Sequence, residues 1–368
     1  MTTSTLRLSL LGLAALITLA SLPSYARDHE RAEFHYRQTN LVSDLPGAQV
    51  TDTNLVNAWG MSFSAGSPFW ISDNGTGKST LYAVTNDPTG APHVTTQGLV
   101  VTIPGDGSVT GQFFDGAGQF HGDVFVFVNE DGTISGWRGA LGTAAETLVP
   151  GSSNNVYKGV AMATNNNATV LLAANFRQGA IDVYDTSLNL ISRLKDHFAP
   201  QDYAPFNIRS FDGVLLVTFA KQDSAKHDDV PGRGHGLIDV LDLQTGRFFR
   251  FATGRDAGGN LEEINSPWGL ATAPKSFAPH SDELLVGNFG SGTIMTFNEF
   301  GKFQGLLEGA HEKSIVIDGL WALAFGNGGS AGVPGDLYFT AGPQSESHGL
   351  FGSLTAVLGG GNNDRDDR

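Results

Sequence analysis

The sequence of 368 residues contains no cysteine, and only 16% of its residues are charged. Without cysteine there are no disulfides, so packing alone must hold the fold. Acidic residues outnumber basic ones by 37 to 22, and the formal net charge of −15 argues against nucleic acid or an anionic membrane as a partner. No segment after residue 26 carries a sustained helical apolar stripe or a long apolar run. These absences exclude a helical protein and a membrane span in the chain that follows residue 26.

Glycine, by contrast, is abundant. The chain has 48 glycines, about one residue in eight, which is near twice ordinary usage. Glycine is costly inside helices and useful in turns, so this composition predicts many short strands joined by tight turns. The glycines follow no three-residue period, which excludes collagen, and an apolar fraction of 40% excludes wholesale disorder.

The first 26 residues have the pattern of a secretory signal. Arg7 precedes an apolar run over 8–22, and Ser24-Tyr25-Ala26 forms a small-x-small cleavage site. The apolar run is short for a membrane span. We therefore expect cleavage after Ala26 and export of the mature chain to the periplasm or the extracellular medium.

A β unit recurs along the rest of the chain. Each copy has an apolar strand, a second apolar strand, a polar or glycine-containing turn and an alternating strand, as in LLAANFRQGAIDVYD (171–185) and LLVGNFGSGTIMTFN (284–298). Six copies follow residue 26, at about 57 residues each, a length typical of four-stranded propeller blades. In the second copy only GAGQFHGD (116–123) is available as the innermost strand. The pattern predicts an all-β, six-bladed β-propeller over 27–357 as a single domain, with a disordered polar tail over 358–368.

The two ends of the repeat predict how the ring closes. The last copy supplies three strands, whereas FHYRQTNLV (34–42) has no partner in the first copy. This N-terminal strand would complete the last blade and remove an open sheet edge.

Loops on one face of a propeller converge at the central channel. The starts of the innermost strands predict that Asn57, Lys158, Asn207, Ser266 and Asp318 lie there. The turns after the second strands place Asp73, Asn175 and Asn288 at equivalent positions, with Glu130 and His348 in other turns of the same face. Carboxylate and amide oxygens are the ligands of Ca²⁺, so Asp73, Asn175 and Asn288 are candidate metal ligands. The alternative is that Asn and Asp at these positions simply stabilise turns.

The segment 221–236, KQDSAKHDDVPGRGHG, is much longer than its equivalents. Such long loops in compact repeats are usually functional or mobile. His227, Asp228 and Asp229 are candidate acid–base groups or ligands, and Lys221 and Asp223 are candidate ligand contacts. The alternative is a solvated charged loop whose ion pairs contribute little.

A series of ordered blocks carries a family resemblance. These blocks include NAWGMSF, VYKGVAM, AKQDSAKHDDV, SPWGLA and VIDGLWALAFGNGG, and the match spans about 35–355. The chain resembles an uncharacterised family of secreted bacterial proteins, some of which end in a PEP-CTERM sorting signal, although this chain lacks that signal. The resemblance implies a six-bladed propeller similar in plan to NHL-repeat and gluconolactonase-like proteins, and it implies no catalytic residues.

Two functions remain open from the sequence, besides a matrix or scaffold role without a small-molecule site. The first is an exported propeller that binds a small molecule, a glycan or a protein through the loops of one face. The second is a metal-dependent hydrolase, lactonase or lyase, in which Ca²⁺ polarises a substrate carbonyl and a carboxylate or His227 moves the proton.

Overall fold

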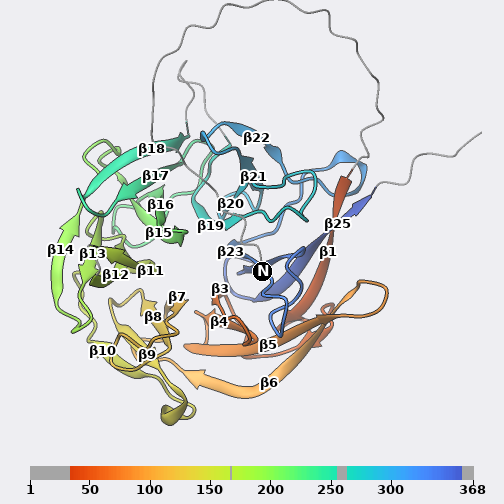
Figure 1. Ribbon diagram of the computed structural model, residues 1–368. Helices are drawn as coiled ribbons and strands as arrows, with labels where there is room; N and C mark the ends of the chain where they lie inside the picture. Colours follow the sequence, from red (N-terminus) through yellow and green to blue (C-terminus); the bar gives the residue numbers. More distant parts are fainter. Residues whose placement is uncertain (1–33, 166–167, 255–262, 359–368) are drawn as a thin grey trace, which may run out of the picture.

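The computed structural model describes residues 34–165, 168–254 and 263–358, and these residues form a ring of six antiparallel sheets (Figure 1). The predicted signal segment and the predicted tail beyond Leu358 lie outside the described residues. In Figure 1 the innermost strands β3, β7, β11, β15, β19 and β23 surround the centre, and each sheet extends outward from them. The predicted six-bladed β-propeller is thereby confirmed.

The sheets follow one another along the chain as blades 1 to 6. Blade 1 contains β3 (Ala58–Ser62), β4 (Phe69–Asp73), β5 (Lys78–Asn86) and β6 (Pro92–Thr102). Blade 2 contains β7 (Val109–Phe114), β8 (Phe125–Asn129), β9 (Ile134–Trp137) and β10 (Glu146–Val149), with a short 3-10 turn η1 (Gly139–Leu141) before β10. Blade 3 contains β11 (Tyr157–Asn165), β12 (Ala168–Asn175), β13 (Ala180–Tyr184) and β14 (Leu190–Leu194).

The second half of the ring repeats this plan. Blade 4 contains β15 (Tyr203–Phe211), β16 (Val214–Lys221), β17 (Gly236–Asp242) and β18 (Arg247–Thr253). Blade 5 contains β19 (Pro267–Thr272), β20 (Leu284–Asn288), β21 (Ile294–Phe297) and β22 (Phe303–Leu306), and a 3-10 turn η2 (Ala310–Glu312) follows it. Blade 6 contains β23 (Leu320–Phe325), β24 (Leu337–Ala341), β25 (Leu350–Leu358), β1 (Phe34–Ser43) and β2 (Val50–Thr51).

The N-terminal strand closes the ring, as the sequence predicts. β1 pairs antiparallel with β25 from Phe34 opposite Leu358 to Ser43 opposite Leu350, with a bulge between Asn40 and Val42. Figure 1 shows the two ends of the described chain, red β1 and blue β25, side by side in one blade. This pairing fixes the first blade against the last and leaves no open gap in the ring.

The second blade corrects one prediction. GAGQFHGD lies in the connection between β7 and β8, and the innermost strand is VTGQFF, which the apolar pattern missed. Its Gln112 is buried because the side-chain amide donates to the carbonyls of Gly60 and Trp70 and to Ser72 Oγ in blade 1. On its other side, Gly111 allows the innermost strand of blade 3 to approach, since a Cβ on Gly111 would lie 2.8 Å from the Cα of Gly159. Gln112 therefore stands where the innermost strands of the other copies have an apolar residue, whereas Gly111 matches Gly60, Gly159 and Gly269.

Three tryptophans from innermost strands form a layer across the channel, hereafter the tryptophan layer. The rings of Trp59 and Trp321 stack with centroids 3.7 Å apart, and Trp268 meets both of them edge-on. All three are buried in the core, where Phe289 stacks on Trp321 at 3.9 Å. Each tryptophan is the second residue of its innermost strand, so the layer crosses the channel near the end at which these strands begin and lies between the two ends. No helix in the described residues is long and apolar enough to cross a membrane.

Candidate functional site

A buried lysine occupies the end of the channel where the innermost strands begin, hereafter the channel mouth. Lys158, the second residue of β11, is only 2% exposed, and its Nζ lies 5.2 Å from the centre of the Trp59 ring. Nζ donates to Glu130 Oε1 and, over 3.2 Å, to Asp228 Oδ1. Burial alone would lower the pKa of Lys158, but the two carboxylates outweigh it and raise this pKa above its ordinary value. The lysine is therefore a charged group held by two acids from other blades.

A chain of hydrogen bonds ties this lysine to the tryptophan layer. Glu130 Oε2 accepts from Asn74 Nδ2 (3.1 Å), and Asn74 Oδ1 accepts from Asn57 Nδ2 (3.1 Å). The same Asn57 amide donates to Glu346 Oε2 (2.8 Å), while its carbonyl oxygen accepts from Trp321 Nε1 (3.0 Å). The amide of Asn57 is thus fixed in orientation by partners on both of its polar atoms.

The long 221–236 segment covers the mouth as a short hairpin. Gln222 and Asp229 form an antiparallel bridge, and Asp223 Oδ1 accepts from the backbone N–H of His227 (2.8 Å) and of Asp228 (3.3 Å). This turn places Asp228 over Lys158. Asp228 Oδ1, which accepts from Lys158 Nζ, also lies 2.8 Å from His227 Nδ1. Of the candidate acid–base groups, Asp228 therefore contacts Lys158 directly, and His227 contacts Asp228.

Two further carboxyls at the mouth differ from Asp228 in their pKa. Burial raises the pKa of Glu346 and of Asp229, and the charge of Lys158 offsets only part of that effect. For Asp228 burial also acts upward, but Lys158 and His227 outweigh it and lower the pKa below its ordinary value. Opposite shifts within one cluster are typical of functional sites, where groups of one type take different roles. Hereafter the mouth cluster consists of Asn57, Asn74, Glu130, Lys158, His227, Asp228, Asp229 and Glu346.

The backbone around the mouth is strained. Asn57 and Ser266, each directly before an innermost strand, have φ of 46° and 47°. Gln344, Ser345 and Glu346 are consecutive residues at φ of 56°, 54° and 65°, which places the Glu346 carboxylate next to Asn57. Residues other than glycine rarely adopt this conformation, and such strain is concentrated at binding and catalytic sites.

An open hollow of about 450 Å³ adjoins the mouth cluster on the same face. Glu130 and His227 belong to the mouth cluster and also line this hollow. The other lining residues are almost all polar: Asp106, Asp131, Gly151, Ser152, Ser153, Asn155, Val156 and Arg177. The hollow therefore offers carboxylates, hydroxyls, an amide and one guanidinium to a ligand.

Two of the three candidate metal ligands after the second strands, Asn175 and Asn288, bond within their own turns. Asn175 Oδ1 accepts from the backbone N–H of Val156 and of Gln178, and its Nδ2 donates to Asp182 Oδ2. Asn288 bonds Asn265 N and Thr293 Oγ1 within blade 5. Asp73 is fully buried beside Thr80, and burial raises the pKa of its carboxyl well above the ordinary value, which favours the neutral acid. These bonds support the turn role for Asn175 and Asn288, whereas neither carboxyl oxygen of Asp73 has a hydrogen-bond partner among the described residues.

Other predicted residues do not belong to the mouth cluster, although Asp223 supports it by accepting from the backbone of His227 and Asp228. Asn207 is the fifth residue of β15, and it donates to the Trp268 carbonyl from a cavity at the opposite end of the channel. Lys221 pairs loosely with Asp202, with Nζ 3.6 Å from Oδ2 and both side chains partly exposed. Asp223 holds the hairpin turn, and the exposed Asp318 accepts from the Gln344 N–H. His348 binds Asp44 Oδ2, 2.7 Å away, and so anchors the segment that follows β1.

Sequence reasoning missed Asn74 and Glu346 as members of the cluster. Asn74 follows Asp73 in the turn after β4, and Glu346 lies in the turn between β24 and β25. The repeat does place both turns on the mouth face, but the left-handed conformation that directs Glu346 inward leaves no signal in the sequence.

Glu130, His227 and Asp228 are the one group at the mouth, among the described residues, whose ligand atoms lie within 4.8 Å of one another and could hold a metal ion. Lys158 donates to two of these three side chains. A divalent ion would therefore have to displace its ammonium group. His121, Asp123 and Glu146 form a second such group in blade 2, where Arg138 bridges the two carboxylates.

Comparison with known sequences finds relatives in a virus. No family model matches the chain. An uncharacterised protein of Acanthamoeba polyphaga mimivirus is 26% identical over 352 residues, which cover 88% of this chain and 81% of that protein. A second uncharacterised protein of the same virus is 31% identical over 209 residues, 54% of this chain and 51% of its own length. These relatives give no support to the expected bacterial origin or to a sorting signal.

Solved structures with a similar fold have dissimilar sequences. A streptogramin B lyase aligns with a TM-score of 0.47 and 12% identity, over 88% of this chain and 98% of that one. The soluble aldose sugar dehydrogenase of Escherichia coli gives 0.48 and 11%, over 87% and 99%. A calcium-binding protein, regucalcin, from Agrobacterium tumefaciens gives 0.48 and 13%, over 83% and 92%. The similar structures thus include both enzymes and a calcium-binding protein, and they concern the fold alone.

Proposed function

We propose that this propeller binds a small hydroxyl-rich ligand, a glycan or a free sugar, at the channel mouth. The observation that carries the proposal is the mouth cluster itself, a buried Lys158 fixed by Glu130 and Asp228 at the edge of a polar hollow. Carboxylate, amide and hydroxyl groups together match the alternating donors and acceptors of a saccharide. The strained Asn57 and Glu346 support it, since preorganised polar groups lower the cost of ordering on binding.

The charges at the mouth favour one class of saccharide. Asp106, Glu130 and Asp131 outnumber Arg177 in the lining of the hollow, and in the adjoining mouth cluster Lys158 is already paired with Glu130 and Asp228. A carboxylated sugar would meet like charges there, whereas a neutral or amino-substituted sugar would not.

Calorimetric titration of the protein with neutral, amino-substituted and carboxylated oligosaccharides tests the proposal. We expect binding of the neutral or amino forms and a loss of about tenfold or more in Asp228→Asn. Asp202→Asn is the matched control, because Asp202 pairs with Lys221 away from the mouth cluster. Failure of all three classes to bind, or equal affinity in D228N and the native protein, would contradict the proposal.

A metal-dependent hydrolase is the second candidate, and Glu130, His227 and Asp228 carry it. A divalent ion bound there would polarise a substrate carbonyl, with Asp229 or Glu346 placed nearby to move a proton. Because Lys158 competes for the same carboxylates, Lys158→Met should raise the affinity for Ca²⁺ or Zn²⁺. A melting temperature that EDTA, Ca²⁺ and Zn²⁺ leave unchanged, both in the native protein and in K158M, would exclude this candidate.

We also infer export of the mature chain, from the signal pattern over residues 1–26. Expression of the full chain in a bacterial host, followed by N-terminal sequencing, tests it. A mature N-terminus at Arg27 outside the cytoplasm is the expected result, and an intact Met1 inside the cell would contradict it.

A further inference from the structure

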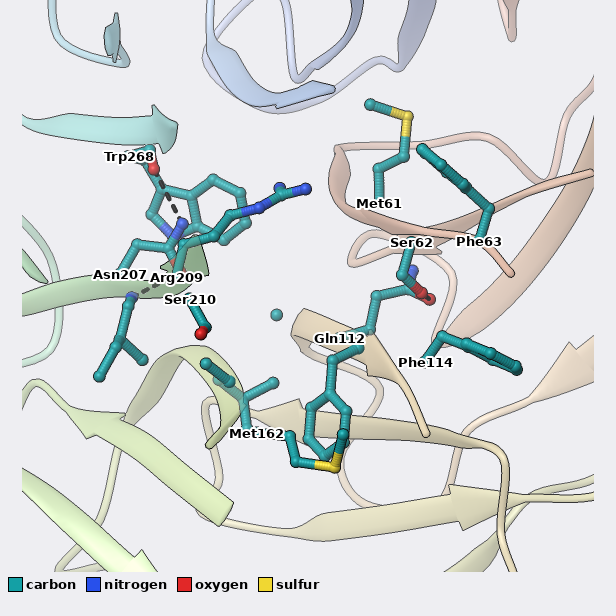
Figure 2. A pocket seen from close by; sticks show the side chains of 15 residues that line it. Met61, Ser62, Phe63, Gln112, Phe114, Met162, Asn207, Arg209, Ser210 and Trp268 are labelled. Atoms are coloured by element: carbon teal, nitrogen blue, oxygen red, sulfur yellow. Dashed lines mark hydrogen bonds between the residues drawn. The ribbon is translucent and has the colours of Figure 1, made fainter. Parts of the chain in front are cut away.

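The end of the channel opposite the mouth holds a second cation, Arg209. A cavity of about 270 Å³ lies there, hereafter the lower cavity, and innermost strands of five blades contribute to its lining. Figure 2 shows the Arg209 side chain extending from β15 into this space, with Trp268 of the tryptophan layer behind it and Met61 across from it. The lower cavity is separate from the mouth cluster, because no member of that cluster lines it.

The walls of the lower cavity are mostly apolar. Methionine and phenylalanine side chains, among them Met61, Phe63, Phe114 and Met162, lie around it in Figure 2. The uncharged polar lining residues are Ser62, Gln112, Asn207 and Ser210; Gln112 is already bonded to blade 1, and Asn207 to the Trp268 carbonyl and the Ile208 N–H. No lining residue is acidic.

Most donors of Arg209 remain free. The guanidinium has five N–H groups, and its one hydrogen bond to a described residue runs from Nη1 to the Leu323 carbonyl over 3.3 Å. Burial lowers the pKa of Arg209, and no carboxylate of the described residues offsets this effect. Lys158 is paired with two acids, whereas Arg209 in the lower cavity has no acidic partner within 34–165, 168–254 and 263–358.

We propose that the lower cavity binds a small organic monocarboxylate, with its carboxylate on Arg209 and its apolar body against the methionine and phenylalanine walls. A planar carboxylate matches the fork of a guanidinium and can accept two parallel hydrogen bonds. Inorganic phosphate carries more charge and more acceptors than one arginine and two serines can satisfy against apolar walls. The volume lies at the small end of ligand pockets, which limits the acid to the size of a single ring or a short chain.

Titration calorimetry with benzoate, benzylammonium and inorganic phosphate tests this site in the full chain. Benzoate should bind, and Arg209→Met should weaken it by about tenfold or more, as expected for a lost charge-assisted pair. Benzylammonium has the same ring with the opposite charge and should not bind, and phosphate should bind more weakly than benzoate. Arg177→Met at the mouth hollow is the matched control and should leave benzoate affinity unchanged.

A second variant keeps the test decisive if R209M does not fold. Met162→Trp fills part of the lower cavity and retains Arg209, so it should reduce benzoate binding while thermal melting shows an intact fold. Equal benzoate affinity in the native protein, R209M and M162W would overturn the proposal, as would a preference for benzylammonium or phosphate. Asp228→Asn should not change benzoate binding, which separates this site from the proposed glycan site.

Discussion

The two ends of the central channel each hold one cation, and the chain surrounds the two cations differently. At the mouth, Lys158 is enclosed by loops from three blades and pairs with Glu130 and Asp228. In the lower cavity, Arg209 lies among mostly apolar side chains and, in the described part of the chain, donates to one backbone carbonyl. A cation with matched acids fixes the geometry of a site, whereas a cation without them is available to a ligand.

The tryptophan layer that separates the two ends should be the most sensitive feature. Trp321→Ala removes a fully buried ring that stacks on Trp59 and Phe289, and we expect a loss of about 3–5 kcal/mol in the free energy of unfolding. Urea unfolding measures this loss. Phe300→Ala, which truncates an exposed ring, should stay within about 0.5 kcal/mol of the native value. Similar losses in both variants would show that the layer is not the core of the ring.

The mouth should depend on its lysine for stability. Lys158→Met leaves the mostly buried Glu130 without its cation, and breaking a buried pair in this way costs about 3 kcal/mol or more, whereas the exposed Asp228 adds little to that loss. The midpoint and slope of urea unfolding give the value. Lys221→Met breaks only a partly exposed pair and should change stability by less than about 1 kcal/mol. An unchanged midpoint for K158M would mean that the mouth cluster does not hold the loops together.

The lower cavity should respond in the opposite way. Arg209→Met removes a desolvated charge that has no acid partner, at the expense of one hydrogen bond and a ring contact with Phe211. We therefore expect stability within about 1 kcal/mol of the native protein. A loss as large as that of K158M in the same unfolding experiment would make Arg209 a structural residue.

The raised pKa of Glu346 should make stability depend on pH. Burial raises this pKa above its ordinary value of 4.5. At pH values between 4.5 and the raised pKa, Glu346 keeps its proton in the folded chain and has lost it in the unfolded chain. The contribution of Glu346 to the free energy of unfolding therefore falls as pH rises from 4.5 through the folded pKa. Glu346→Gln should flatten this decline in unfolding experiments from about pH 4 to pH 8.

An exposed carboxyl gives the control for that profile. Glu312→Gln, on the surface after blade 5, should leave the pH dependence as it is in the native protein. If E346Q followed the native profile as closely as E312Q does, burial of Glu346 at the mouth would not be the cause of the decline.

The sequence predicts the ring and part of the mouth, because both follow from a repeat. Six copies and an unpaired N-terminal strand determine the blade count and the closure, and they bring Asn57, Lys158, His227 and Asp228 to one end. Glu346 was not predicted because its position depends on three consecutive left-handed residues. The apolar pattern predicts that the innermost strand of blade 4 starts near Asn207, at the mouth. The strand β15 begins earlier, at Tyr203, so Asn207 lies further along the channel.

Arg209 was missed for a related reason. It lies in FNIRSF, where strand alternation shows a polar residue among apolar ones but not that the channel receives it. A polar residue on an innermost strand faces either a neighbouring blade, as Gln112 does, or the channel, and only the packing of the ring distinguishes the two.

Crystals of the full chain grown with 4-bromobenzoate would test the difference between the two cations most directly, since the anomalous signal of bromine locates the acid. We expect a peak in the lower cavity, with the carboxylate on Arg209, and none beside Lys158. A peak beside Lys158, or no peak in the lower cavity at a saturating concentration of the acid, would contradict this expectation.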